Sequence, residues 1–118
     1  MNFPGARLHM LALAVVGLIF GGGGIGKLMS MPQFHTSFAD LGWPGWSGYA
    51  VGGAEVLGVI ALFLPSLRKA SALGLLVIAC GAIWYHFRFP PLLAAGPAFV
   101  ALIACLLILM YRPGGVHR

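Results

Sequence analysis

Residues 47–69 read SGYAVGGAEVLGVIALFLPSLRK. An apolar run extends from Ser47 to Leu64, Pro65 closes it, and the basic pair Arg68 and Lys69 follows. An α-helix needs about 20 apolar residues to cross a hydrocarbon core of about 30 Å. The stretch therefore predicts a membrane helix that ends at a basic turn facing water.

Three further apolar runs lie on either side of this one, over residues 8–28, 70–87 and 91–111. Of the 118 residues, 60% are hydrophobic and only 8% are charged, and the mean hydropathy is +0.97. Such a chain has too little polar surface to cover a water-soluble domain. We predict an all-α integral membrane four-helix bundle in which residues 1–118 form one domain and residues 30–46 form an external connection.

Lysine and arginine predict the orientation, because cytoplasmic connections carry the excess of both. The N-terminus, the second connection and the C-terminus hold Arg7, Arg68, Lys69, Arg112 and Arg118. The first and third connections hold only Arg88, with Lys27 just inside a helix end. We therefore expect both termini to be cytoplasmic, in a bacterial inner membrane.

The net charge of +5 does not indicate nucleic acid as a partner, because the basic residues form no stripe with interleaved aromatic residues.

Glycines recur at a spacing that lets membrane helices approach closely. The G-x-x-x-G pairs are Gly17 with Gly21, Gly22 with Gly26, and Gly48 with Gly52. Tight packing explains them, and the close approach of a ligand to bare backbone is the alternative. Four short helices cannot bury all of these faces among themselves. We therefore expect a homo-oligomer or a complex with a membrane redox partner.

Glu55 is the most informative residue, since a carboxylate in hydrocarbon costs a few kcal/mol unless it is protonated or paired. Helical spacing places four residues on one stripe: Gly48, Gly52, Glu55 and Val59. The packing face therefore also points Glu55 into the bundle. Lys27 and His86 lie towards the same outer end, and either could pair with Glu55. Two interpretations stay open: a polar clamp that fixes helix register, and the polar lining of a cavity that opens to the outer leaflet.

Other residues near the outer end are candidates for binding a ligand: Trp43, Trp46, Trp84, Tyr85, Arg88 and His35. His35 and His86 could in principle ligate haem or a metal, but no spacing between them indicates this. Cys80 and Cys105 make no ligand pattern either. We predict no metal site, and a visible absorption spectrum of the purified protein decides the question of haem.

The ordered set of these residues resembles the DoxX-like family of small four-helix membrane proteins. The resemblance lies in residues 24–28 (GIGKL), 42–44 (GWP), 52–58 (GGAEVLG) and 81–86 (GAIWYH), and it covers about residues 15–110. It implies a four-helix bundle and, from the founding members, a membrane subunit of a thiosulfate:quinone oxidoreductase. The chain has no cysteine positioned for sulfur chemistry at its outer face.

Three functions follow as hypotheses. The first is binding of a lipophilic small molecule such as a quinone in the outer half of the bundle, within a redox assembly. The second is a stand-alone membrane enzyme of the isomerase type, in which Glu55 and His86 act as general acid and base and Lys27 supports them. The third is a non-catalytic assembly subunit whose polar cluster only fixes helix register.

Overall fold

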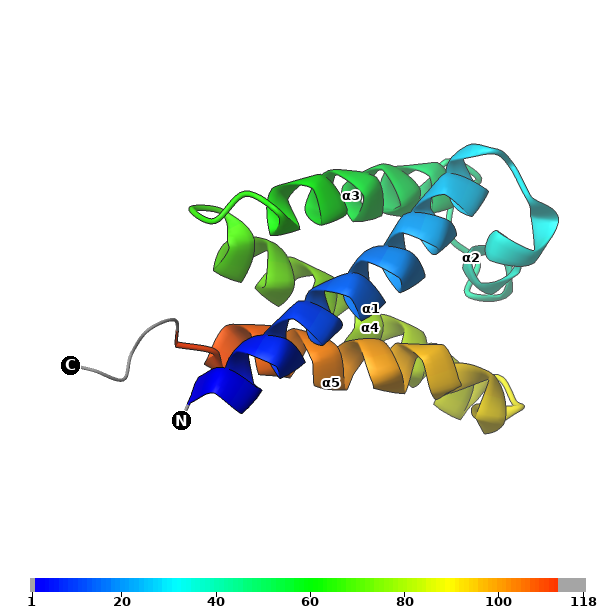
Figure 1. Cartoon of the computed structure of the whole chain (residues 1–118). Coiled ribbons are helices and arrows are strands. Elements are labelled where there is room, and N and C mark those ends of the chain that lie inside the picture. Colours follow the sequence, from blue (N-terminus) through cyan, green and yellow to red (C-terminus); the bar gives the residue numbers. More distant parts are fainter. Residues whose placement is uncertain (1, 113–118) are drawn as a thin grey trace.

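The computed structural model describes residues 2–112, which form helices joined by short connections (Figure 1). Arg118 lies outside the described residues. In chain order the elements are α1 (Asn2–Leu28), the 3₁₀ turn η1 (Pro32–Phe34), α2 (Thr36–Asp40), α3 (Ser47–Leu62), α4 (Arg68–Arg88), the 3₁₀ turn η2 (Leu92–Ala95) and α5 (Gly96–Met110). The predicted all-α class is confirmed, and the connection over residues 30–46 contains two short helical elements of its own.

Three helical segments are long and apolar enough to cross a membrane: Gly5–Leu28, Arg68–Arg88 and Leu92–Met110. The chain is therefore an integral membrane protein. Helix α3 is apolar but has 16 residues, and at 1.5 Å per residue it is about 24 Å long, less than the hydrocarbon core. Of the four predicted membrane helices, three are thus long enough to cross. That α3 also crosses the membrane stays a prediction.

The basic pair at residues 68 and 69 lies inside α4 and not in a turn before it. The Nε atom of Arg68 donates to the carbonyl of Leu62 at 2.7 Å, at the end of α3. The Nζ atom of Lys69 donates to the carbonyls of Leu109 and Tyr111 at 3.0 and 3.1 Å, at the end of α5. Carbonyls at a helix end lack partners within the helix, and cations near them are favourable. The two side chains therefore hold three helix ends together.

Other helix bounds also differ from the prediction. Helix α1 begins at Asn2, several residues earlier than expected, and α3 ends two residues earlier, at Leu62. The last run divides into η2 and α5, and Pro97 stands in the first turn of α5. Proline is tolerated there because the first turn of a helix leaves its N–H groups unbonded in any case.

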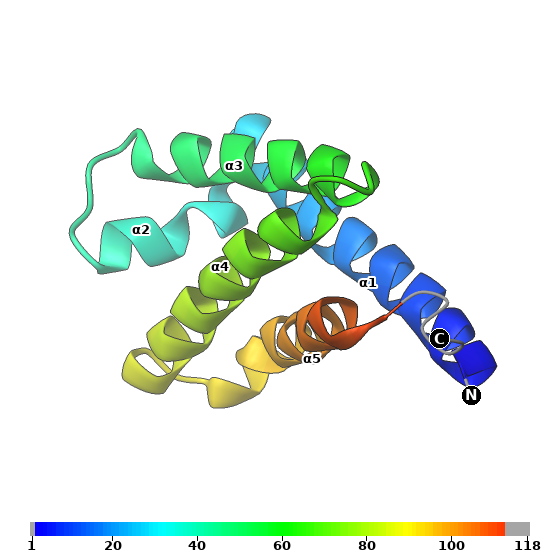
Figure 2. The ribbon, with the colours of Figure 1, turned by 90° about the vertical axis from the view of Figure 1, so that its left-hand side faces the viewer.

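Each long helix packs against two others: α1 and α4 each contact both α3 and α5 (Figures 1 and 2). The largest fully buried side chains at these contacts are Val16, Leu62, Leu75, Cys105 and Ile108. Large apolar side chains also point outwards; Leu18 is 77% exposed and Leu93 is 89% exposed. Outward apolar side chains suit a protein whose solvent is lipid.

The connections divide between the two ends of the molecule. The start of α1, the α3–α4 turn and the end of α5 lie at one end, while α2 and the α4–α5 connection lie at the other (Figure 1). The first end carries Arg7, Arg68, Lys69 and Arg112. We call it the basic end and the opposite end the outer end. The assignment of the basic end to the cytoplasm stays a prediction.

Candidate functional site

The end of α1 sets the direction of Lys27. Ser30 has a positive φ of 62°, the N–H of Met31 donates to the carbonyl of Gly26 at 3.1 Å, and the N–H of Ser30 donates to that of Lys27 at 3.2 Å. This pair of bonds is the Schellman motif, which stops the helix. Helical side chains tilt towards the N-terminus, so the Lys27 chain runs back along α1. Its Nζ atom lies 3.5 Å from where a Cβ at Gly23 would be.

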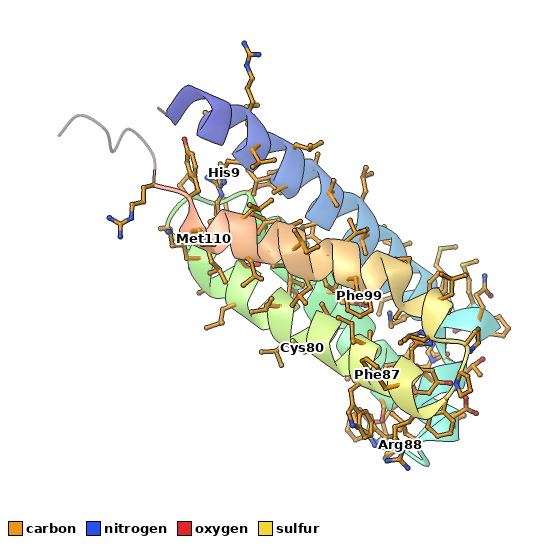
Figure 3. The ribbon with its side chains drawn as sticks, turned by 90° about the horizontal axis from the view of Figure 1, so that it is seen from below. His9, Cys80, Phe87, Arg88, Phe99 and Met110 are labelled. Atoms are coloured by element: carbon orange, nitrogen blue, oxygen red, sulfur yellow. The ribbon has the colours of Figure 1, made fainter. Side chains whose placement is uncertain are left out.

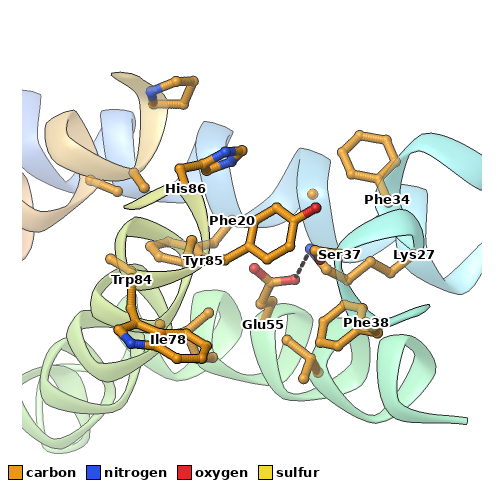
Figure 4. A pocket seen from close by; sticks show the side chains of 18 of the residues that line it. Phe20, Lys27, Phe34, Ser37, Phe38, Glu55, Ile78, Trp84, Tyr85 and His86 are labelled. Atoms are coloured by element: carbon orange, nitrogen blue, oxygen red, sulfur yellow. Dashed lines mark ion pairs between the residues drawn. The ribbon is translucent and has the colours of Figure 1, made fainter. Parts of the chain in front are cut away.

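Lys27 and Glu55 form an ion pair inside the molecule (Figure 4). Nζ of Lys27 lies 2.9 Å from Oε1 of Glu55, and the two side chains are 14% and 5% exposed. Glu55 was predicted to lie in the interior within reach of Lys27 or His86, and the structure assigns the pairing to Lys27. The predicted packing stripe is confirmed as well, because Gly48, Gly52 and Glu55 are all buried.

Direct contact between two helix backbones makes this pairing possible. A Cβ added to Gly24 would lie 2.9 Å from the carbonyl oxygen of Gly52, and one added to Gly52 would lie 2.7 Å from Cβ of Lys27. Only glycine fits at these positions. Gly21 and Gly22, by contrast, have nothing within 4 Å of an added Cβ, so close packing within the described part of the chain does not require glycine there.

A cavity of about 710 Å³ lies beside the ion pair, between the outer halves of the long helices and the connection that covers them (Figure 4). Its polar lining comes from Lys27, Ser37, Glu55, Tyr85 and His86, and apolar or aromatic side chains make up most of the rest. Ligand sites typically measure a few hundred to about 1,000 Å³, with apolar walls and a few placed polar groups. The cavity has the size and the lining of such a site.

His86 brings an unused hydrogen-bonding group to this cavity. Its Nδ1 atom is buried and has no hydrogen-bond partner within residues 2–112. The ring meets that of Tyr85 edge to face, with the centroids 5.0 Å apart. Buried polar atoms are nearly always paired, so an unpaired one beside a cavity marks a position where a ligand or water can bind.

The connection between α1 and α3 forms the cover of the cavity. Its elements η1 and α2 and the turn after them contribute Phe34, Ser37, Phe38, Leu41 and Trp43. Two bonds hold the cover. Nε2 of His35 donates to the carbonyl of Lys27 at 2.8 Å, and the hydroxyl of Tyr85 donates to the carboxylate of Asp40. Of the side chains that the connection contributes to the lining, the sequence selected only Trp43 as a candidate, because composition does not reveal which side chains of a connection turn inwards.

The candidate ligand residues divide into two groups. Trp43, Trp84 and Tyr85 line the cavity, together with Lys27, Glu55 and His86. Trp46, Arg88 and His35 are not part of the lining. Trp46 is 67% exposed, and the guanidinium of Arg88 lies over the ring of Trp84 at 5.6 Å. The edge of His35 that carries Nε2 is occupied by the backbone of Lys27.

Residues that sequence reasoning did not select complete the lining. Phe20 faces the cavity from α1, and the ring centroid of Phe34 lies 5.6 Å from Nζ of Lys27.

Within residues 2–112, no group of three or more His, Cys, Asp or Glu residues is placed to hold a metal ion.

Comparison with known proteins gave one family. The family model described as "DoxX-like family" matches residues 11–110. No curated protein and no solved structure matched the chain. The matched range contains the ion pair, His86 and the connection that covers the cavity.

Proposed function

We propose that this chain, which belongs to the DoxX-like family, binds a lipophilic small molecule such as a quinone in the cavity at its outer end, as part of a membrane redox assembly. The observation that carries the proposal is the buried Lys27–Glu55 ion pair facing an apolar cavity of about 710 Å³. An ion pair that only held two helices together would need no cavity beside it.

The chemistry of the lining suits a flat head group with two carbonyl oxygens. The ammonium of Lys27 has three N–H donors, of which one is directed at Glu55. Another can reach an oxygen of the ligand, while Lys27 balances the negative charge of Glu55. Nδ1 of His86, which is without a partner in the described chain, can donate to or accept from the head group. Glu55 and His86 are thus the proposed proton partners of the head group.

Tryptophan fluorescence provides the test, since Trp43 and Trp84 line the cavity and Trp46 does not. Quinones quench indole fluorescence at close range. We expect a short-tailed ubiquinone to bind the lipid-reconstituted protein saturably. Glu55→Gln and His86→Phe should each weaken binding about tenfold, or about 1.4 kcal/mol.

The control variant is Trp46→Phe, which removes an indole at the same end but outside the cavity. Its affinity should equal that of the wild type. The absence of saturable quenching, together with the absence of any quinone in protein purified from native membranes, would remove the proposal.

Acid–base catalysis on an apolar substrate is the second candidate. Glu55 and the unpaired Nδ1 of His86 face one cavity, where both could act on a bound molecule away from water. A product assay with candidate apolar substrates separates this function from binding alone. If the chain is only an assembly subunit, Glu55→Gln should lower stability and change no activity per folded molecule.

The assembly itself also has a proposed surface. Gly21 and Gly22 on α1, and Gly74 on α4, leave open space where a Cβ would be, and none of the three lines the cavity. Another helix can approach such positions closely, so we expect a homo-oligomer or a complex with a redox partner. Native mass spectrometry that finds only monomer across mild detergents would contradict self-association.

A further inference from the structure

A second recess lies at the basic end, far from the cavity, and His9 is its polar group. His9 is only 8% exposed, and its Nδ1 atom is buried without a hydrogen-bond partner in the described chain. The ring stacks on Tyr111, with the centroids 3.9 Å apart and the planes 10° from parallel. Figure 3 shows His9 between α1 and the end of α5 near Met110.

The recess measures about 170 Å³ and lies between α1 and α5. It is lined by Gly5, Leu8, His9, Leu107, Met110 and Tyr111, none of which lines the large cavity. Leu8 and Met110 are exposed, 45% and 72% respectively, and so extend the apolar lining to the surface. The recess therefore joins one buried polar atom to a surface suited to an acyl chain.

The charge around this recess is positive and has no acidic counterpart. The chain contains only two acidic residues, Asp40 and Glu55, and both have partners at the outer end. Lys69 lies close to His9, because its Nζ atom donates to the carbonyl of Tyr111, whose ring stacks on that of His9, and Arg68 precedes Lys69 in α4. Within residues 2–112 no acidic side chain lies at the basic end, so a bound anion can supply negative charge there.

Lys69 also fixes the shape of the recess. Its Nζ atom donates to the carbonyls of Leu109 and Tyr111, which holds the end of α5 against the start of α4. Tyr111 is thereby kept in its stack with His9. The binding groups are in place before a ligand arrives, which reduces the ordering that binding requires.

We propose that this recess binds the phosphate of an anionic phospholipid. Nδ1–H of His9 donates to a phosphate oxygen, Arg68 and Lys69 supply the positive field, and an acyl chain lies along Leu8 and Met110. Anionic lipids are attracted to basic segments at a membrane surface in general. The buried nitrogen of His9 adds a hydrogen bond at one position. This bond would hold one phosphate in a defined place, which the general attraction to basic residues does not do.

Native mass spectrometry of the delipidated full chain tests the proposal. The chain is titrated with phosphatidylglycerol or with phosphatidylcholine carrying the same acyl chains. We expect the first phosphatidylglycerol to bind about tenfold more tightly than the first phosphatidylcholine, as one charge-assisted hydrogen bond would give. His9→Phe keeps the stack on Tyr111 but removes the donor, and should abolish this preference. Arg88→Gln, which removes a cation at the outer end, should leave it unchanged.

Three results would overturn the proposal. Equal affinity of the wild type for the two lipids would do so, and this measurement needs no variant. A preference that persists in His9→Phe with an unchanged circular dichroism spectrum would do so as well. If millimolar inorganic phosphate displaces phosphatidylglycerol, the site takes free phosphate and not lipid.

Discussion

The ammonium nitrogen of Lys27 and a carboxylate oxygen of Glu55 lie 2.9 Å apart, with neither side chain more than 14% exposed. They belong to α1 and α3, whose backbones touch at Gly24 and Gly52. A lysine in the last turn of a membrane helix usually extends to the interface, but this one turns back into the protein. The ion pair, the contact between α1 and α3 and the shape of the cavity therefore depend on one another, and a substitution in one should alter the others.

Lys27→Met should destabilise the protein, because it leaves the carboxylate of Glu55 buried without its partner. Removing one member of a buried ion pair typically costs about 3 kcal/mol or more. The free energy of unfolding, measured by titrating mixed micelles with a denaturing detergent, checks this. The double variant Lys27→Met with Glu55→Gln should recover most of the loss. A double variant as unstable as the single one would show that the pair is not the source.

Gly52→Ala should separate α1 from α3. The new methyl would lie 2.7 Å from Cβ of Lys27 and 3.0 Å from the carbonyl oxygen of Gly24, and backbone cannot move aside cheaply. Overpacking of this kind costs about 1–3 kcal/mol. The neighbouring Gly53 has nothing within 4 Å of an added Cβ. Gly53→Ala should therefore be neutral or stabilising, and equal effects of the two variants would rule out this contact.

Gly48→Ala should loosen the cover of the cavity. A methyl at residue 48 would overlap the ring of His35, whose Nε2 atom donates to the carbonyl of Lys27. Loss of that bond should speed amide hydrogen exchange in residues 34–41 about fivefold, since a net hydrogen bond is worth about 1 kcal/mol. Gly45→Ala, where an added Cβ meets nothing within 4 Å, is the control. Unchanged exchange in Gly48→Ala would mean that His35 does not anchor the cover.

Tyr85→Phe should make ligand exchange faster. The variant keeps the ring that lines the cavity but removes the hydroxyl that donates to Asp40 in the cover. We expect the dissociation rate of a short-tailed ubiquinone to rise several-fold, about what the loss of one hydrogen bond of 1 kcal/mol gives. Stopped-flow fluorescence measures the rate, and Tyr111→Phe at the basic end serves as the control. Identical dissociation rates in Tyr85→Phe and the wild type would show that the hydrogen bond from Tyr85 to Asp40 does not hold the cover closed.

Cysteines introduced at Ser37 and Ser66 should react from opposite sides of the membrane. Ser37 lies in α2 and Ser66 in the α3–α4 turn, at the two ends of the molecule (Figure 1). In a background with Cys80 and Cys105 replaced by alanine, an impermeant maleimide should label Ser37→Cys in intact cells. It should label Ser66→Cys only after permeabilisation, because basic residues favour the cytoplasm. The reverse pattern would invert the orientation and place the cavity on the cytoplasmic side.

The sequence alone determined the all-helical membrane fold and the inward position of Glu55. Lipid offers no hydrogen bonds, so an apolar run of this length can satisfy its backbone only as a helix. A carboxylate exposed to lipid would be too costly, so Glu55 must face the interior. The helical period of 3.6 residues places it on the same face as the glycines, and this follows from the sequence of one helix alone. Both conclusions depend on local pattern and solvent, which sequence encodes directly.

Only the tertiary structure decided which residue pairs with Glu55 and which residues enclose the cavity. Lys27 and His86 were equal candidates by depth, but Gly24 and Gly52 bring α1 against α3, and the motif at Ser30 fixes where α1 ends. The inward turn of Phe34 and the outward position of Trp46 likewise depend on how the connection folds back over the helices. Side chains of similar composition face opposite ways there, because the path of a connection is set by contacts between distant residues, which local periodicity does not contain.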